Sequence, residues 1–165
     1  MIKYIMTIFV LSTLLFGQTS EDFFEDSVDD LQETLQEAKD SGKKGIFLFF
    51  EMDNCPFCAR MEQNVLNQDE IIKVYKENFI NLTVDIKGSI DMVDFDGTDT
   101  LQKKFAFKHK IRATPVQMFF DLNGKKIFKR TGYTDAKTFL LMGRYITDGI
   151  YKKENFIKYK RRMLK

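Results

Sequence analysis

The sequence predicts one α/β domain with a mixed central sheet flanked by helices. Short apolar, β-branched and aromatic runs that are typical of strands alternate with segments of helical periodicity. The alternation closes with two strands joined by a tight turn, followed by a helix. Alternating elements that end in an antiparallel hairpin indicate a layered α/β fold with a mixed sheet.

The start of the chain has the layout of a secretory signal peptide. Met1-Ile2-Lys3 is a short positive start, residues 4–16 are apolar, and Gly17 offers a small residue for cleavage. The apolar stretch is shorter than the roughly 20 residues that span a bilayer. We therefore expect a periplasmic protein in which residues 1–17 are removed and residues 18–165 form a single domain. An uncleaved N-terminal anchor is the alternative, and an N-terminal mass measurement distinguishes the two.

An acidic helix is the first predicted element, over residues 21–40, because apolar side chains recur there at helical spacing. The stretch contains nine acidic residues and one lysine, and Ser41-Gly42 ends it. Its predicted apolar face consists of Phe24, Val28, Leu31, Leu35 and Ala38.

The next elements surround the two cysteines of the chain. The apolar run 45–52 predicts a buried strand, and residues 56–66 predict a helix. A second helix is expected from Asp69. Residues 79–85 are rich in β-branched and aromatic side chains and predict another strand.

Residues 86–98 form an insertion in which Asp96-Gly97 favours a hairpin turn. A calcium loop does not fit this insertion. Met92 occupies the first ligand position of such a loop, and Lys103 occupies the position of its bidentate acid. A helix is predicted next, over about 99–108.

The last third of the chain predicts a hairpin between helices. Pro115 opens a strand over 116–120, which a tight turn at 122–125 connects to a strand over 126–130. A helix over about 135–151 and a basic helix over about 152–165 complete the domain. Residues 151–165 include seven basic side chains and one acidic side chain.

The motif Cys55-Pro56-Phe57-Cys58 contains every cysteine of the chain and lies between a predicted strand and a predicted helix. Pro56 suits the first turn of a helix, where its missing N–H costs nothing. The free amides and positive dipole of the helix start favour a Cys55 thiolate. Cys58 follows about one turn later, close enough to close a disulfide. The motif therefore predicts thiol–disulfide exchange.

The three other interpretations of the cysteines are a zinc site, covalent haem and a structural disulfide. Zinc needs four ligands, and His109 is the one histidine that could join the pair. Covalent haem needs a histidine at position 59, where the chain has Ala59. A purely structural disulfide would close a four-residue loop, which constrains the unfolded chain little. We expect no metal and no cofactor besides the redox-active disulfide.

The elements, in this order, resemble the thioredoxin family over about residues 24–160. The strand and Cys-Pro-Phe-Cys motif match the family's active-site turn, and Ile111-Arg112-Ala113-Thr114-Pro115 matches the loop that carries its cis-proline. Asn123-Gly124-Lys125 and Gly132 match the closing hairpin and the glycine that faces the active site. The insertion at 86–98, the Gly132-Tyr133-Thr134 turn and the aromatic C-terminal segment more narrowly resemble periplasmic SoxW-type thioredoxins.

The resemblance implies a thioredoxin fold and a role for each site residue. Cys55, exposed at the helix start, is the expected nucleophile, and Cys58 is expected to resolve the mixed disulfide. Thr114, Pro115 and Gly132 are expected to contact the substrate, with a cis bond leaving the Thr114 backbone free to pair with a substrate strand.

Two positions depart from the family pattern. The family has a buried acid six residues before the first cysteine, where this chain has Phe49, and a tryptophan directly before that cysteine, where this chain has Asn54. Glu51 and Asp53 are candidates for the missing proton relay, although both residues could simply be exposed acids. His109 falls where the family has an aromatic residue, which favours packing over acid–base chemistry.

The resemblance to SoxW-type proteins implies a periplasmic oxidoreductase that reduces the disulfides of specific exported partners. Sulfur-oxidation carrier proteins or apocytochromes are the implied substrates, and a membrane thiol-electron transporter is the implied donor. A disulfide-forming oxidant or isomerase is an alternative, as is a non-enzymatic interaction module with a structural disulfide. We expect a monomer. The 26 basic and 24 acidic residues of the chain do not favour nucleic-acid binding.

The basic C-terminal segment admits three interpretations: a solvated helix that packs on the fold, a docking site for an acidic partner, and a docking site for anionic lipid.

Overall fold

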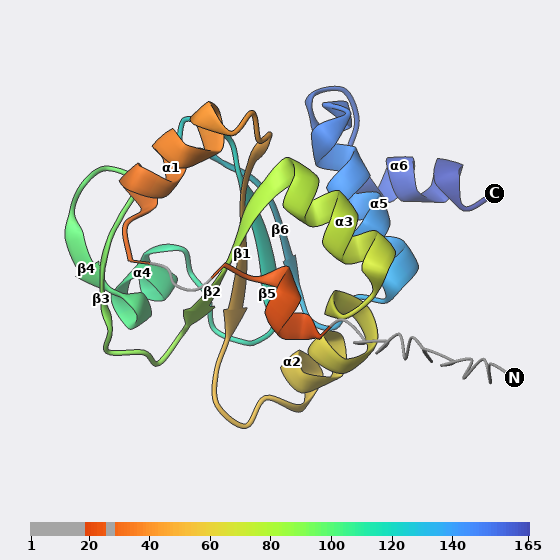
Figure 1. Cartoon of the computed structure of the whole chain (residues 1–165). Coiled ribbons are helices and arrows are strands. Elements are labelled where there is room, and N and C mark those ends of the chain that lie inside the picture. Colours follow the sequence, from red (N-terminus) through yellow and green to blue (C-terminus); the bar gives the residue numbers. More distant parts are fainter. Residues whose placement is uncertain (1–18, 26–28) are drawn as a thin grey trace, which may run out of the picture.

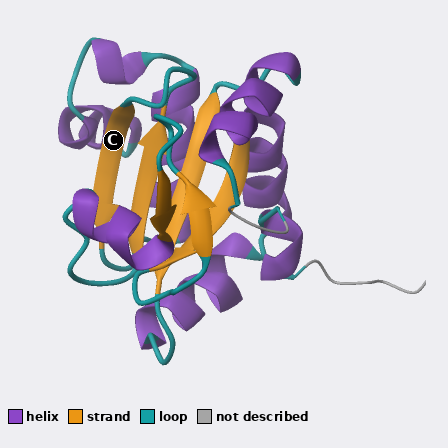
Figure 2. Cartoon of the chain, turned by 90° about the vertical axis from the view of Figure 1, so that its left-hand side faces the viewer, coloured by secondary structure: helices purple, strands orange, loops and turns teal. Residues whose placement is uncertain are grey.

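A computed structural model describes residues 19–25 and 29–165 of the chain. A four-stranded mixed sheet with the order β2-β1-β5-β6 forms the centre of the fold (Figure 2). β1 (Gly45–Glu51) pairs in parallel with β2 (Phe79–Asp85) and antiparallel with β5 (Val116–Phe120). β5 continues into an antiparallel hairpin with β6 (Lys126–Thr131). The predicted α/β class, mixed sheet and closing hairpin are confirmed.

One face of the sheet is covered by α2 (Pro56–Met61), α3 (Asp69–Asn78) and α5 (Ala136–Thr147). Because successive strand residues point to opposite faces, Phe47 and Phe49 of β1 both point to this side. The Tyr75 ring stacks on Phe139 with 4.3 Å between ring centroids, and its hydroxyl donates a hydrogen bond to the Phe139 carbonyl. This core therefore fixes α3 against α5.

The opposite face is covered by α1 (Leu31–Asp40) and α4 (Gln102–Lys108), which lie on the left in Figure 1. Leu48 and Phe50 of β1 point into this second core, and Phe50 stacks on Phe105 of α4. His109 packs its ring against Phe105 and Phe120, with centroid distances of 4.5 and 5.3 Å. The predicted packing role of His109 is confirmed.

The predicted acidic helix over 21–40 is wrong in its first half. A 3₁₀ turn, η1 (Ser20–Phe23), comes first, and α1 begins at Leu31 with the Asp30 carboxylate accepting the N–H groups of Gln32 and Glu33. Phe24 is not on this helix; it packs against Phe23 and Phe49 on the other face of the sheet. Val28 lies outside the described residues. Leu31, Leu35 and Ala38 do form the buried face of α1.

The insertion contains a small hairpin, as predicted, but its second strand takes residues that the sequence assigns to a helix. β3 (Asp91–Val93) pairs antiparallel with β4 (Asp99–Leu101), so α4 begins at Gln102 and not at 99. The turn between them places Asp94 beside Lys108, at 2.6 Å between carboxylate and ammonium.

The predicted helix over 56–66 is confirmed, although its second half, η2 (Glu62–Leu66), is π-helical.

The end of the chain contains more elements than predicted. α5 ends at Thr147, Gly149 has a left-handed φ of 66°, and a short turn η3 (Ile150–Lys152) leads to α6 (Phe156–Met163). Phe156 and Tyr159 anchor α6 on Tyr145 of α5. None of the helices in the part of the chain described by the structure has the length and apolar character needed to cross a bilayer.

Candidate functional site

The two cysteines lie at the start of α2, immediately after the loop that follows β1. Their sulfurs form a disulfide, and the two Cα atoms are 5.2 Å apart. Pro56 occupies the first turn, as predicted, and the Cys55 sulfur accepts the Cys58 backbone N–H at 3.2 Å. Cys55 is 8% exposed and Cys58 is 3% exposed, so Cys55 is less exposed than predicted, although it remains the more accessible of the two.

The predicted substrate loop lies directly over this disulfide. The Thr114–Pro115 peptide bond is cis, and the Thr114 hydroxyl donates to the Cys55 sulfur at 3.2 Å. Gly132 donates its N–H to the Pro115 carbonyl at 2.8 Å and has a φ of 92°, a conformation that favours glycine. The structure therefore places Thr114 against Cys55, and Gly132 against Pro115 of the same loop.

A buried glutamine that the sequence analysis missed supports this loop. Gln117 of β5 is fully buried, and its amide nitrogen donates to the Gly132 carbonyl at 3.1 Å. Its amide oxygen accepts the Thr134 hydroxyl at 2.8 Å, and that hydroxyl in turn accepts Arg130 Nε at 2.8 Å. Because buried amide groups need partners, this chain of bonds fixes the Gly132–Thr134 turn relative to β5. The sequence signal that could have identified Gln117 is a single polar residue inside an otherwise apolar strand.

One cation–π contact and one exposed aromatic side chain complete the rim. The Arg60 guanidinium lies 4.5 Å from the centroid of the Tyr133 ring, which joins α2 to the Gly132 turn. The Phe57 side chain, inside the Cys-Pro-Phe-Cys motif, is 55% exposed. The site thus presents an apolar side chain beside a nearly buried disulfide.

A pocket of about 420 Å³ beside the cysteines contains a pair of carboxyl groups. Glu51 and Glu62 line this pocket together with Cys55 and Cys58. Burial, the Glu62 charge and a hydrogen bond with Glu62 raise the pKa of Glu51 from 4.5 to about 7, with smaller contributions from Asp85 and Asp53. An acid with a pKa of about 7 can exchange a proton near neutral pH.

Glu51 lies two residues beyond the position at which the family has its buried acid. Phe49 is completely buried at the position six residues before Cys55. Glu51 follows two residues later on the same face of β1, closer to the mouth of the site. Asp53 is exposed and does not line the pocket, so of the two predicted candidates the structure places only Glu51 beside the cysteines. Glu62 was missed, although it follows Cys58 by four residues, a spacing that places both on one helix face.

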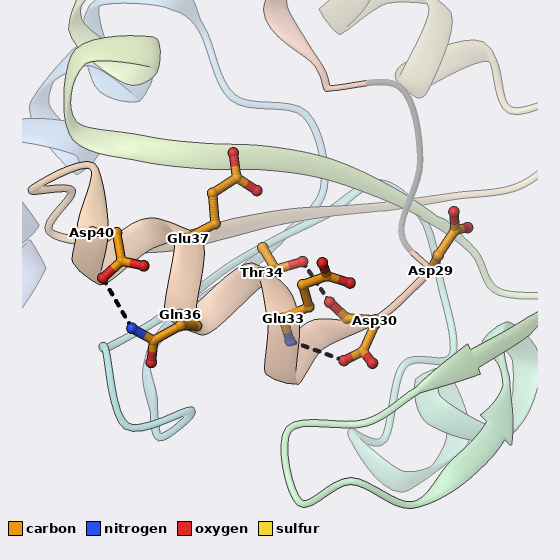
Figure 3. Close-up of a pocket in the computed structure, with 7 residues that line it drawn as sticks. All are labelled: Asp29, Asp30, Glu33, Thr34, Gln36, Glu37 and Asp40. Atoms are coloured by element: carbon orange, nitrogen blue, oxygen red, sulfur yellow. Dashed lines mark hydrogen bonds between the residues drawn. The ribbon is translucent and has the colours of Figure 1, made fainter.

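A second hollow is lined by acidic residues of α1 and the segment before it (Figure 3). Two of its side chains take part in helix-end interactions: Asp30 caps the first turn, and Asp40 accepts the Gln36 amide at 2.9 Å. It lies at the end of β1 remote from α2 in Figure 1 and contains no cysteine. We therefore assign the exchange site to the Cys55–Cys58 pocket.

Comparison with known proteins agrees with this architecture. The family model of the thioredoxin-like domain matches residues 31–147. A thioredoxin-fold protein from Helicobacter pylori superposes with a TM-score of 0.67 at 23% identity, covering 87% of this chain and 95% of its own.

Two further solved structures show the same arrangement. The C-terminal domain of Neisseria meningitidis DsbD has a TM-score of 0.52 at 18% identity, covering 68% of this chain and 90% of its own. A Thermus thermophilus thioredoxin has a TM-score of 0.56 at 18% identity, covering 74% and 88%. No curated protein matches the sequence significantly. The predicted thioredoxin fold is confirmed.

Proposed function

The chain belongs to the thioredoxin-like domain family, and on that premise we propose that it is a periplasmic thiol–disulfide oxidoreductase that reduces disulfides of exported protein partners. The observation that carries the proposal is the Cys55–Cys58 disulfide at a helix start, directly under a cis Thr114–Pro115 loop. The sulfur of Cys55 accepts one backbone and one hydroxyl hydrogen bond, and both donors would stabilise the thiolate that forms when the disulfide is reduced.

The proposed reaction exchanges one disulfide for another. The Cys55 thiolate attacks a partner disulfide, a Cys55–partner bond forms, and the second partner sulfur leaves as a thiolate that takes up a proton. The Cys58 thiol then loses its proton and attacks the Cys55 sulfur. The Cys55–Cys58 disulfide forms, the partner's remaining sulfur leaves, and two electrons have passed to the partner.

The partner strand is proposed to dock along the Thr114–Pro115 loop. Strand pairing of β5 begins at Val116, so Thr114 precedes the sheet and its backbone can pair with an extended partner segment. Gly132 has no side chain to obstruct such a segment, and the exposed Phe57 ring offers it an apolar contact.

Glu51 is proposed to accept the proton that Cys58 loses. Cys58 is almost fully buried, and water is therefore a poor base for its thiol. Glu51 shares the pocket with Cys58, and its pKa of about 7 leaves a substantial fraction ionised at neutral pH. Glu62 raises that pKa by placing a second carboxyl group against the first.

The proposed direction of electron flow rests on the SoxW-type resemblance, which implies a reductant supplied by a membrane thiol-electron transporter. The DsbD C-terminal domain, of the same fold, is known in both reduced and oxidised forms, which supports a cycling dithiol. Sulfur-oxidation carriers or apocytochromes are the proposed substrates. A disulfide-forming oxidant would use the same residues in the reverse order, and the reduction potential distinguishes the two.

Trapping the mixed disulfide tests the proposal. A Cys58→Ser variant lacks the resolving thiol, so it should accumulate exported proteins bound to Cys55, and dithiothreitol should release them. Cys55→Ser retains Cys58 and is the matched control; it should trap little, because Cys58 is 3% exposed. If neither variant captures a partner protein, the proposed enzymatic function is wrong and the disulfide is structural.

A further inference from the structure

Exposed apolar and basic side chains occur together in α6 and in Leu164, which follows it. Ile157 is 72% exposed, and Met163 and Leu164 are 44% and 41% exposed. These are three of the six large hydrophobic side chains that the described part of the chain exposes. Lys158 and Arg161 lie beside Ile157 on the outward side, since both are exposed while Phe156 and Tyr159 point inward.

This surface is held rigidly by the fold. The Phe156 ring lies 5.2 Å from Phe128 of β6 and 5.3 Å from Tyr145 of α5, measured between centroids. The Asn155 side chain caps α6 by accepting the Lys158 N–H at 3.0 Å. The Tyr145 hydroxyl donates to the Glu154 carbonyl at 2.6 Å, which fixes the turn before the helix. The outward face of α6 is thus presented in one orientation.

The outward basic side chains of α6 are not neutralised by neighbouring ion pairs. Glu154 is the one acidic residue in 151–165, and it is already paired with Arg162 at 2.5 Å. Lys158 and Arg161 form no ion pair with any residue in the described ranges. An anionic partner can therefore approach both cations without displacing an existing bond.

The acidic helix α1 and the basic helix α6 lie far apart in the molecule. α1 is at the upper left of Figure 1, and α6 is on the right, away from α2. Figure 3 shows how densely carboxylates gather around α1. An extended anionic surface would attract the basic side chains of α6 and repel the acidic side chains of α1.

We propose that α6 docks on an anionic lipid surface, with Ile157 and Leu164 entering the headgroup boundary and Lys158 and Arg161 contacting phosphates. A lipid interface accepts apolar and basic side chains from the same helix face. α6 lies at the edge of the molecule, where an extended surface can reach it (Figure 1). The proposal does not depend on the dithiol chemistry, because α6 lies away from α2.

The absence of tryptophan from the chain gives a local probe for the full-length protein. Ile157→Trp introduces a single fluorophore at an exposed position of α6, and Phe107→Trp places a matched one on α4, where Phe107 is 83% exposed. Other contacts of the chain with lipid are shared by both variants. With phosphatidylglycerol–phosphatidylethanolamine vesicles, Ile157→Trp emission should shift to the blue and Phe107→Trp emission should not.

Charge variants measure how much the basic side chains of α6 contribute to vesicle binding. Adding Lys158→Glu and Arg161→Glu to Ile157→Trp should weaken vesicle binding by at least about 30-fold, because two basic contacts are lost and the new carboxylates are repelled by the anionic surface. Lys87→Glu with Lys104→Glu changes the net charge equally, outside α6, and should have a much smaller effect. About 1 M salt, which shortens the screening length to about 3 Å, should weaken binding strongly.

Three results would overturn the proposal. One is unshifted Ile157→Trp emission with anionic vesicles. Another is an equal shift with phosphatidylcholine vesicles, which would mean that charge plays no part. The third is a shift with polyglutamate but not with vesicles, which would assign the surface to an acidic protein.

Discussion

Individual side chains around the disulfide decide how it exchanges. Thr114 and the Cys58 amide contact the Cys55 sulfur directly, whereas Glu51 and Glu62 line the pocket beside Cys58 and are proposed to act through its proton. The sequence predicts the cysteine pair from one short motif, and the resemblance to thioredoxins predicts the cis-proline and Gly132. Gln117 and Glu62 were missed because their roles depend on partners that only the tertiary structure brings close.

Replacing Glu51 should change the pH dependence of mixed-disulfide resolution. Below a pH of about 7 the Glu51 carboxyl is protonated and cannot accept a proton, and above that pH it is ionised, so the wild-type rate should rise through about pH 7 and then level off. Glu51→Gln should slow resolution at pH 7 by about 100-fold and move the inflection toward the ordinary thiol pKa of about 8.5. Stopped-flow measurement of partner release gives both values.

Asp53→Asn is the control for that measurement. Asp53 is exposed and lies outside the pocket, so its loss should leave the pH profile nearly unchanged. An unchanged profile in Glu51→Gln, or an equal change in Asp53→Asn, would remove Glu51 from the proton pathway.

Replacing Gln117 by methionine should destabilise the fold. The substitution keeps the approximate size of the side chain but leaves the Gly132 carbonyl without its buried donor. We expect a loss of about 1–3 kcal/mol in the free energy of unfolding, measured by urea denaturation. Gln63→Met, at an exposed position of η2, should be close to neutral. Equal stability of the two variants would mean that the network contributes nothing.

At the scale of elements, local pattern predicted most boundaries and failed where tertiary pairing decides. Apolar spacing runs on unbroken from residue 24 to residue 38, yet the Glu25 N–H donates to the Asn81 carbonyl of β2 at 2.8 Å, outside any helix. That contact extends the pairing at the edge of β2, which periodicity cannot reveal. β4 has three residues, too few to show any period.

The N-cap of α1 is predicted to set where this helix begins. Asp30→Ala removes an acceptor from the Gln32 and Glu33 amides and should cost about 1 kcal/mol of stability. Asp40→Ala removes the same charge at the C-terminal end of α1, where a negative side chain is unfavourable, and should cost less. Thermal unfolding of the two variants checks the order, and a reversed order would contradict the cap.

For the whole molecule, the sheet separates two cores that should contribute independently to stability. Phe139 belongs to the core under α3 and α5, and Phe105 belongs to the core under α1 and α4. Phe139→Leu and Phe105→Leu should each destabilise by about 1 kcal/mol, and the double variant should equal their sum within about 0.5 kcal/mol. A larger deviation in urea unfolding would show that the two cores are coupled.

The reduction potential of the Cys55–Cys58 couple tests the central claim most directly. The protein is equilibrated in redox buffers of graded potential, and the free thiols are alkylated and counted by mass. A reductant of exported partners should show a reversible two-electron transition near the value of thioredoxin, about −270 mV. A potential near about −120 mV would contradict a reducing role, and a disulfide that exchanges with no thiol reagent would contradict the enzyme itself.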